Sequence, residues 1–173
     1  MANSLDSLVS LTLNATITTA PGTIGSSMAA LAKIYGTHFT QGTGAAQADL
    51  AWWQERTLAA STGESLDLSG VQTDPYGNVI LFARLKVLAI AASAANTNNV
   101  VVGNAPSNGV AGLFGALTHT AIVRPGGFHA WGCGATDTTG YPITGGTADQ
   151  LYILNGGSGT TVTYDVIAIG CSV

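Results

Sequence analysis

Short runs of β-branched, aromatic and aliphatic residues recur along this chain, and turn-forming residues separate them. The runs follow one another at intervals of about 8 to 20 residues, which is the pattern of an all-β domain. Twenty-three of the 173 residues are glycine, and glycine supplies the turns that many short strands require. We expect about nine or ten strands that form a single-domain β-sandwich with a jelly-roll-like arrangement, spanning residues 1–173.

The most regular segment lies near the start of the chain, where apolar and polar residues alternate over residues 8–18. Val9, Leu11 and Leu13 fall on one side of this segment. Successive side chains of a strand point to opposite faces, so the pattern predicts a strand with one buried face. Pro21 and Gly22 follow this segment and predict a turn.

Other stretches are harder to assign. Residues 26–34 place apolar side chains at a spacing that suits a short helix. Residues 79–91 form the longest apolar run, and the turns on both sides favour one long central strand over a helix. We expect turns at 74–78 and at 125–127, the latter between two strands, and a hairpin loop at 155–159.

Charged residues make up only 8% of the chain, against about 25% in an average domain. The five Lys and Arg residues are scattered, so the sequence predicts neither a nucleic-acid partner nor a basic helix on a membrane surface. No run approaches the roughly 18 apolar residues of a membrane span, and residues 1–6 lack the features of a signal peptide. We therefore expect a protein that is made in the cytoplasm and is not exported.

No motif for phosphate binding, dinucleotide binding or a serine nucleophile occurs in the sequence. His129 and Cys133 are the best-spaced pair of metal-ligand types, but a zinc site needs three or four ligands. Asp137 and Asp149 could supply the two carboxylates of a glycosidase, although we favour turn-forming roles for both. We therefore expect no catalytic residues, no metal and no cofactor.

The two cysteines, Cys133 and Cys171, leave one question open. Assembly in the cytoplasm argues against a disulfide between them. The required geometry is not readable from a sequence, so the sequence does not decide whether the bond forms.

Trp52 and Trp53 form the most unusual dipeptide in the chain. In a strand, one of them faces the core and the other faces outward. An outward tryptophan suits a protein contact first, a covering loop of the same chain second and a sugar platform third. The residues that we expect at contacts with other protein subunits are Val9, Leu11, Leu13, Trp52, Trp53, Phe114 and Trp131.

Four segments, FARLK, VRPGG, TGYPITGGTAD and VTYDVIAIG, occur in this order between residue 38 and the C-terminus. In these segments the chain resembles a group of small structural proteins of tailed bacteriophages, over about three-quarters of its length. The resemblance implies a non-catalytic component of the virion head, of the decoration type. Residues 1–33 match less clearly, and we expect them to form an N-terminal arm or an extra strand that takes part in assembly.

From these features we expect a non-enzymatic virion protein, made in the bacterial cytoplasm, that decorates or cements the capsid. Its partners would be the major capsid protein, other virion subunits and further copies of itself in a trimer or another closed ring. The alternative is a tail- or fibre-associated protein that binds a host surface glycan through Trp53 or Trp131. A third reading is a glycan hydrolase with Asp137 and Asp149. The sequence leaves copy number, symmetry and position in the virion open.

Overall fold

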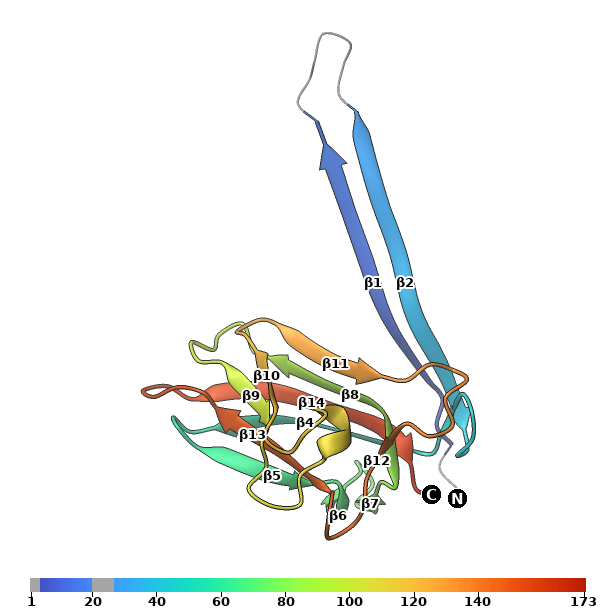
Figure 1. The fold of residues 1–173 in the computed structure, drawn as a ribbon, viewed down its shortest axis with the longest axis vertical. Coiled ribbons are helices and arrows are strands. Elements are labelled where there is room, and N and C mark those ends of the chain that lie inside the picture. Colours follow the sequence, from blue (N-terminus) through green and yellow to red (C-terminus); the bar gives the residue numbers. More distant parts are fainter. Residues whose placement is uncertain (1–3, 20–26) are drawn as a thin grey trace.

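Two antiparallel sheets packed face to face form the body of the chain in the computed structural model, which describes residues 4–19 and 27–173 (Figure 1). The five-stranded sheet contains β11 (Phe128–Gly132), β8 (Arg84–Ala92), β14 (Val162–Cys171) and β4 (Leu50–Leu58) in this spatial order, with β12 (Tyr141–Pro142) paired to β8. The four-stranded sheet contains β10 (Thr120–Val123), β9 (Val100–Gly103), β13 (Gln150–Asn155) and β5 (Gly63–Asp67). This architecture confirms the predicted all-β sandwich.

Shorter elements complete the body. The strands β6 (Ser69–Thr73) and β7 (Val79–Leu81) form a two-stranded hairpin. Its turn at 74–78 is as predicted, because the carboxylate of Asp74 accepts hydrogen bonds from the backbone N–H groups of Tyr76 and Asn78, both at 2.8 Å. The 3₁₀ helix η1 (Ala111–Leu113) lies in the long connection between β9 and β10.

The core lies between the two sheets. The alternation along β14 illustrates how the core forms. Val162, Tyr164, Val166 and Ala168 are buried, and the residues that lie between them face outward. Burial of such apolar side chains stabilises the fold by about 25 cal/mol for each Å² removed from water. Trp52 is the largest fully buried side chain of this core.

A long two-stranded arm rises from one end of the body (Figure 1). It consists of β1 (Ser7–Thr18) and β2 (Met28–Gln41), which pair antiparallel along their length from Ser7–Phe39 to Thr18–Met28. The short β3 (Gln47–Ala48) pairs parallel to the end of β2. The turn predicted at Pro21 and Gly22 lies outside the described residues.

Two expectations for this region were wrong. Residues 28–34 belong to β2 and not to a short helix, because the pairing with β1 satisfies their backbone groups in an extended conformation. Residue 26 lies outside the described residues. The predicted half-burial of residues 8–18 also fails, because the arm projects beyond the body and its outer part is exposed on both faces.

Two further expectations were wrong. Residues 79–91 do not form one strand, because Phe82 and Ala83 donate hydrogen bonds to Leu68 and Cys171, and the chain passes from β7 into β8 of another sheet. The loop at 155–159 joins β13 to β14, which belong to different sheets, so it does not close a hairpin. The turn predicted between two strands at 125–127 is confirmed, since it joins β10 to β11.

Candidate assembly surface

The side of the arm that carries Val9, Leu11 and Leu13 is its more apolar side, and we call it the apolar face. Residues directly opposite in an antiparallel pair share a face, so the register of β1 and β2 fixes its membership. Leu11 and Leu13 remain more than 40% exposed. The residues of this face from base to tip are Val9 and Thr37, Leu11 and Tyr35, Leu13 and Lys33, Ala15 and Leu31, and Ile17 and Ala29.

The base of the arm is anchored on the outer face of the five-stranded sheet. Phe39 of β2 is fully buried and forms a second apolar cluster with Val87 and Ile169, and Val9 packs against it. At the base of the arm its two strands are also joined to each other, since the imidazole Nε2 of His38 in β2 lies 2.8 Å from a carboxylate oxygen of Asp6, which precedes β1. Burial of Phe39 thus fixes the root of the arm, while the part beyond Leu11 has no support from the body.

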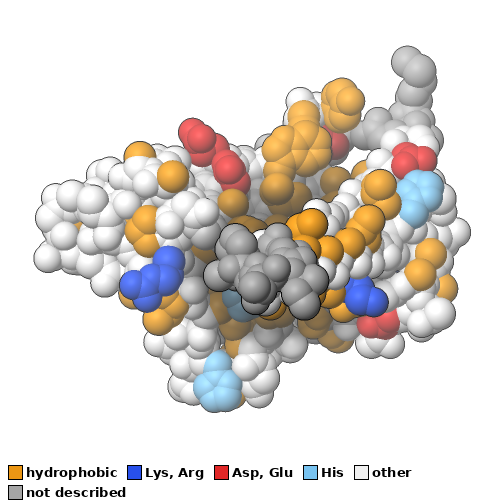
Figure 2. Space-filling view, turned by 90° about the horizontal axis from the view of Figure 1, so that it is seen from above, with side chains coloured by type: hydrophobic (Ala, Val, Ile, Leu, Met, Phe, Trp, Pro, Cys, Tyr) orange, Lys and Arg blue, Asp and Glu red, His pale blue; other side chains and the backbone are white. Residues whose placement is uncertain are grey.

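The outer face of the five-stranded sheet continues this apolar surface. Trp53 is 56% exposed, and Ile167, which lies directly opposite it across β4 and β14, is 42% exposed. Phe128 on the edge strand β11 is also exposed. Figure 2 looks along the arm onto this side of the molecule and shows hydrophobic side chains gathered around the arm, with few charged ones among them.

A groove of about 760 Å³ separates the arm from the edge strand β11. Val9, Leu11 and Tyr35 line it from the arm, and Phe128 and Ala130 line it from the sheet. Its walls are thus mainly apolar. Contiguous exposed apolar surface is the property that makes this groove a candidate contact site.

The other candidate contact residues divide between core and surface. Trp52 is 1% exposed, so it belongs to the core and is not accessible to a partner, whereas its neighbour Trp53 points outward as the strand pattern required. Trp131 and Phe114 are half-buried and pack edge to face, with ring centroids 5.2 Å apart. Both line a shallow depression of about 500 Å³ that also contains His119 and His129.

The groups considered for chemistry have structural contacts. The Asp137 carboxylate accepts hydrogen bonds from the backbone N–H groups of Thr139 and Gly140, and that of Asp149 accepts one from Gly146. Cys133 and Cys171 are free thiols, and burial raises the pKa of both. Within residues 4–19 and 27–173, no cluster of three or more His, Cys, Asp or Glu side chains could hold a metal ion.

Lys86 is a buried cation that the sequence analysis did not single out. It is fully buried in β8, and its Nζ donates a 2.6 Å hydrogen bond to the backbone carbonyl of Asp137. The Sγ of Cys133 lies 3.2 Å from the backbone carbonyl of Lys86 itself. Lys86 therefore fastens the segment after β11 to the sheet.

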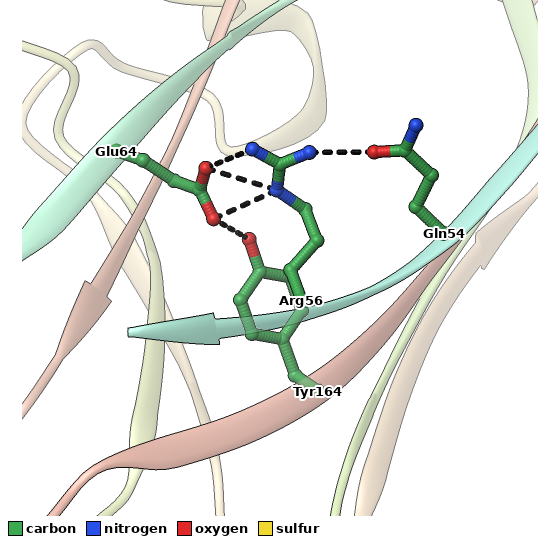
Figure 3. A network of polar contacts seen from close by, with 4 residues as sticks. All are labelled: Gln54, Arg56, Glu64 and Tyr164. Carbon is green, nitrogen blue, oxygen red and sulfur yellow. Dashed lines mark hydrogen bonds and ion pairs between the residues drawn. The ribbon is translucent and has the colours of Figure 1, made fainter. Parts of the chain in front are cut away.

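One polar network joins the edges of the two sheets (Figure 3). Arg56 on β4 forms an ion pair with Glu64 on β5, Gln54 accepts a hydrogen bond from Arg56, and the Tyr164 hydroxyl donates one of 2.6 Å to Glu64. Burial alone raises the pKa of Glu64. The hydrogen bonds from Arg56 and Tyr164, together with the charge of Arg56, outweigh it and hold that pKa below its ordinary value of 4.5.

Replacing Glu64 by Gln is expected to lower the free energy of unfolding by about 1–3 kcal/mol at pH 7, because Arg56 then keeps a half-buried charge without its counter-ion. A carboxyl group whose pKa is lowered on folding stabilises the fold above its ordinary pKa, and this contribution is lost as the pH falls through the lowered value. The difference between variant and parent should therefore shrink below pH 4.5. Urea unfolding at pH 7 and at pH 3 measures it.

The matched control is Glu55→Gln on β4, the strand that carries Arg56, since Glu55 is exposed. Its effect on unfolding should stay within about 0.5 kcal/mol. An equal loss in both variants would contradict the structural role of the network.

Sequence reasoning missed half of the candidate surface. It did not assign Leu31, Tyr35 or Phe39 of β2, nor Phe128 and Ile167 of the sheet. A signal for β2 was present, because Ala29, Leu31, Tyr35 and Phe39 alternate with other residues on both sides of the polar Lys33.

Two general findings concern membrane-spanning helices and similarity to known proteins. In the part of the chain that the structure describes, no helix is long and apolar enough to cross a membrane. No family model, curated protein or solved structure matches the chain.

Proposed function

We propose that this chain is a non-enzymatic structural subunit of a tailed-phage virion, and that it decorates or cements the capsid by binding the major capsid protein. The observation that carries the proposal is the arm. A two-stranded ribbon that stands alone in water is marginally stable, yet this one extends far from the body with Leu11, Leu13 and Ile17 exposed (Figure 1). Such a ribbon gains stability when a partner covers it.

The order of the strands supports this proposal. The two main sheets, apart from the short β12, contain eight strands, and we number these along the chain from the first to the eighth: β4, β5, β8, β9, β10, β11, β13 and β14. One sheet then has the order 6-3-8-1 and the other 5-4-7-2. We propose that this is a jelly roll, in which the pairs 1–8, 2–7, 3–6 and 4–5 lie side by side. Jelly rolls occur in viral capsid proteins and in lectins, so the fold suits the proposal without proving it.

The low charge of the chain also favours a subunit surrounded by neighbours. Many of its exposed apolar side chains lie on the arm and on the sheet beside it, and a smaller group lies on the β6–β7 hairpin. The carboxylates of Asp137 and Asp149 accept backbone hydrogen bonds in two separate turns, which favours a structural role for both residues over a role in glycan hydrolysis. Binding to the capsid would then stabilise the particle by mass action.

The test is the copy number of the chain in purified virions of the phage that encodes it. We expect hundreds of copies, in a fixed ratio to the major capsid protein, and matching density on the capsid in electron micrographs. Particles that lack the chain should lose that density and should open at a lower temperature. A handful of copies at the tail or neck, or unchanged capsid density without the chain, would refute decoration.

A glycan-binding role in the tail or in a fibre is the second candidate, and the depression around Trp131 favours it. An aromatic edge beside two imidazoles, those of His119 and His129, could hold a sugar ring through stacking and hydrogen bonds. A glycan array with purified protein tests this role. Binding that Trp131→Ala abolishes would support it, and absence of binding to every glycan would exclude it.

A further inference from the structure

The apolar face of the arm carries a single charged residue. Lys33 lies opposite Leu13, and both of its neighbours along this face of β2, Leu31 and Tyr35, are apolar or aromatic. Lys33 is exposed and has no ion-pair partner among the described residues. A partner that covers the apolar face would therefore bind best if it placed an anionic group beside this cation.

The outer face of the five-stranded sheet carries a matching pattern. The register places Trp53, Ile167 and Ala89 in one row across β4, β14 and β8. In the next row, two positions along each strand, Glu55 lies directly opposite Asp165. The face therefore presents an apolar row beside a pair of carboxylates.

These two carboxylates have no basic partner among the residues that the structure describes. Glu55 and Asp165 are both exposed, and neither belongs to an ion pair within the described residues. Like charges directly opposite in a sheet destabilise the pairing. A cation supplied from outside would relieve this repulsion.

The arm of a molecule is held away from its own sheet beyond the base. Burial of Phe39 against Val87 and Ile169 fixes its root, and the rest rises clear of the body (Figure 1). The apolar face of an arm can therefore cover the outer face of a five-stranded sheet only if the two belong to different chains. A second copy of this chain carries both matching surfaces, the sheet face with its carboxylates and the arm, on which the apolar pair Leu11 and Tyr35 is followed by Lys33.

We propose that the apolar face of one arm packs on the outer face of the five-stranded sheet of a second copy, with Lys33 beside Glu55 and Asp165 of that copy. The inference rests on the proposed role as an assembly subunit and names its first partner. The free part of the arm, the eight pairs from Leu11–Tyr35 to Thr18–Met28, covers about 27 Å by 10 Å, or about 270 Å² on each partner. Two copies that exchange arms in a closed dimer bury about 1,100 Å² in total, close to the lower end of the 1,200–2,000 Å² typical of stable interfaces.

Charge reversal tests the contact on the purified full chain by sedimentation over a range of concentrations. The parent should form a closed oligomer, and Lys33→Glu should raise the concentration at which it dissociates at least tenfold. The double variant Glu55→Lys with Asp165→Lys should do the same. The triple variant that combines all three changes restores opposite charges and should recover most of the association.

Asn14→Glu is the matched control, because Asn14 lies on the other face of the arm and the change adds the same sign of charge. It should leave the oligomer intact. A parent that stays monomeric at 100 micromolar concentration, a Lys33→Glu variant that associates like the parent, or a triple variant without recovery would each overturn the proposed contact. A monomer that still coats capsids would refute the contact alone, whereas an oligomer that ignores capsids would refute only the decoration role.

Discussion

Replacing Trp52 by Ala is expected to lower the free energy of unfolding by about 3–5 kcal/mol, whereas the same change at Trp53 should alter it by less than about 1 kcal/mol. The two residues are neighbours in β4, but Trp52 is 1% exposed in the core and Trp53 is 56% exposed on the outer face. Removal of the Trp52 indole leaves a large cavity between the sheets. Urea unfolding of the two variants at low protein concentration measures both effects.

Trp53→Ala should instead weaken association between copies by at least tenfold, since Trp53 lies in the row that the arm of a second copy is proposed to cover. Sedimentation of the folded variant measures this loss. If both variants unfold with similar ease, then Trp53 is covered by its own chain. If Trp53→Ala associates as the parent does, the outer sheet face is not the docking surface.

The strands of the body were largely predictable because their period is local. In β14 the alternation of side chains gives both the type of element and the face that is buried. In β4 it places Trp52 and Trp53 on opposite faces but does not say which of the two is buried. The turn at Asp74 was predictable for the same reason, since its hydrogen bonds join residues within a stretch of five. Local chemistry therefore specifies elements and turns.

Pairing between strands was not predictable, because partners lie far apart in the chain. A glycine-rich loop such as 155–159 has the same composition whether it closes a hairpin or crosses between sheets. Here β13 and β14 pair with β5 and β4, about a hundred residues earlier in the sequence. The break at Phe82 escaped notice for the same reason, since it depends on hydrogen bonds to Leu68 and Cys171.

The arm shows how far the candidate site could be predicted from the sequence. Alternation in β1 indicates an apolar face, but it does not say whether the chain's own body covers that face. Val9 and Phe39 pack against the body, while Leu11 and Leu13 on the same face do not, and nothing in the pattern marks this boundary. The exposed part was therefore predicted as half-buried. Its exposure is the observation that the proposed assembly role depends on.

Replacing Leu11, Leu13 and Leu31 together by Thr is expected to reduce binding to capsids by at least 100-fold, which corresponds to about 2.7 kcal/mol. These residues are proposed to hold the copies together, and a separated copy loses the gain in affinity of an oligomer that binds the capsid at several points. Threonine keeps the preference for β-strand, so the change removes apolar surface and leaves the arm extended. The three residues are exposed, and unfolding of the body should therefore change by less than about 1 kcal/mol. Occupancy of stripped capsids, titrated with parent and variant protein, measures the loss.

The control makes the same number of changes on the opposite face, where Ser10, Thr12 and Thr16 are replaced by Ala. This variant should bind capsids as the parent does, because only one face of the ribbon is proposed to be covered. Equal losses in both variants would mean that the arm acts through its backbone edge, as an added strand, and not through its apolar face. Full binding by the leucine variant would show that capsid binding depends neither on the apolar face of the arm nor on the contact between copies that this face is proposed to make.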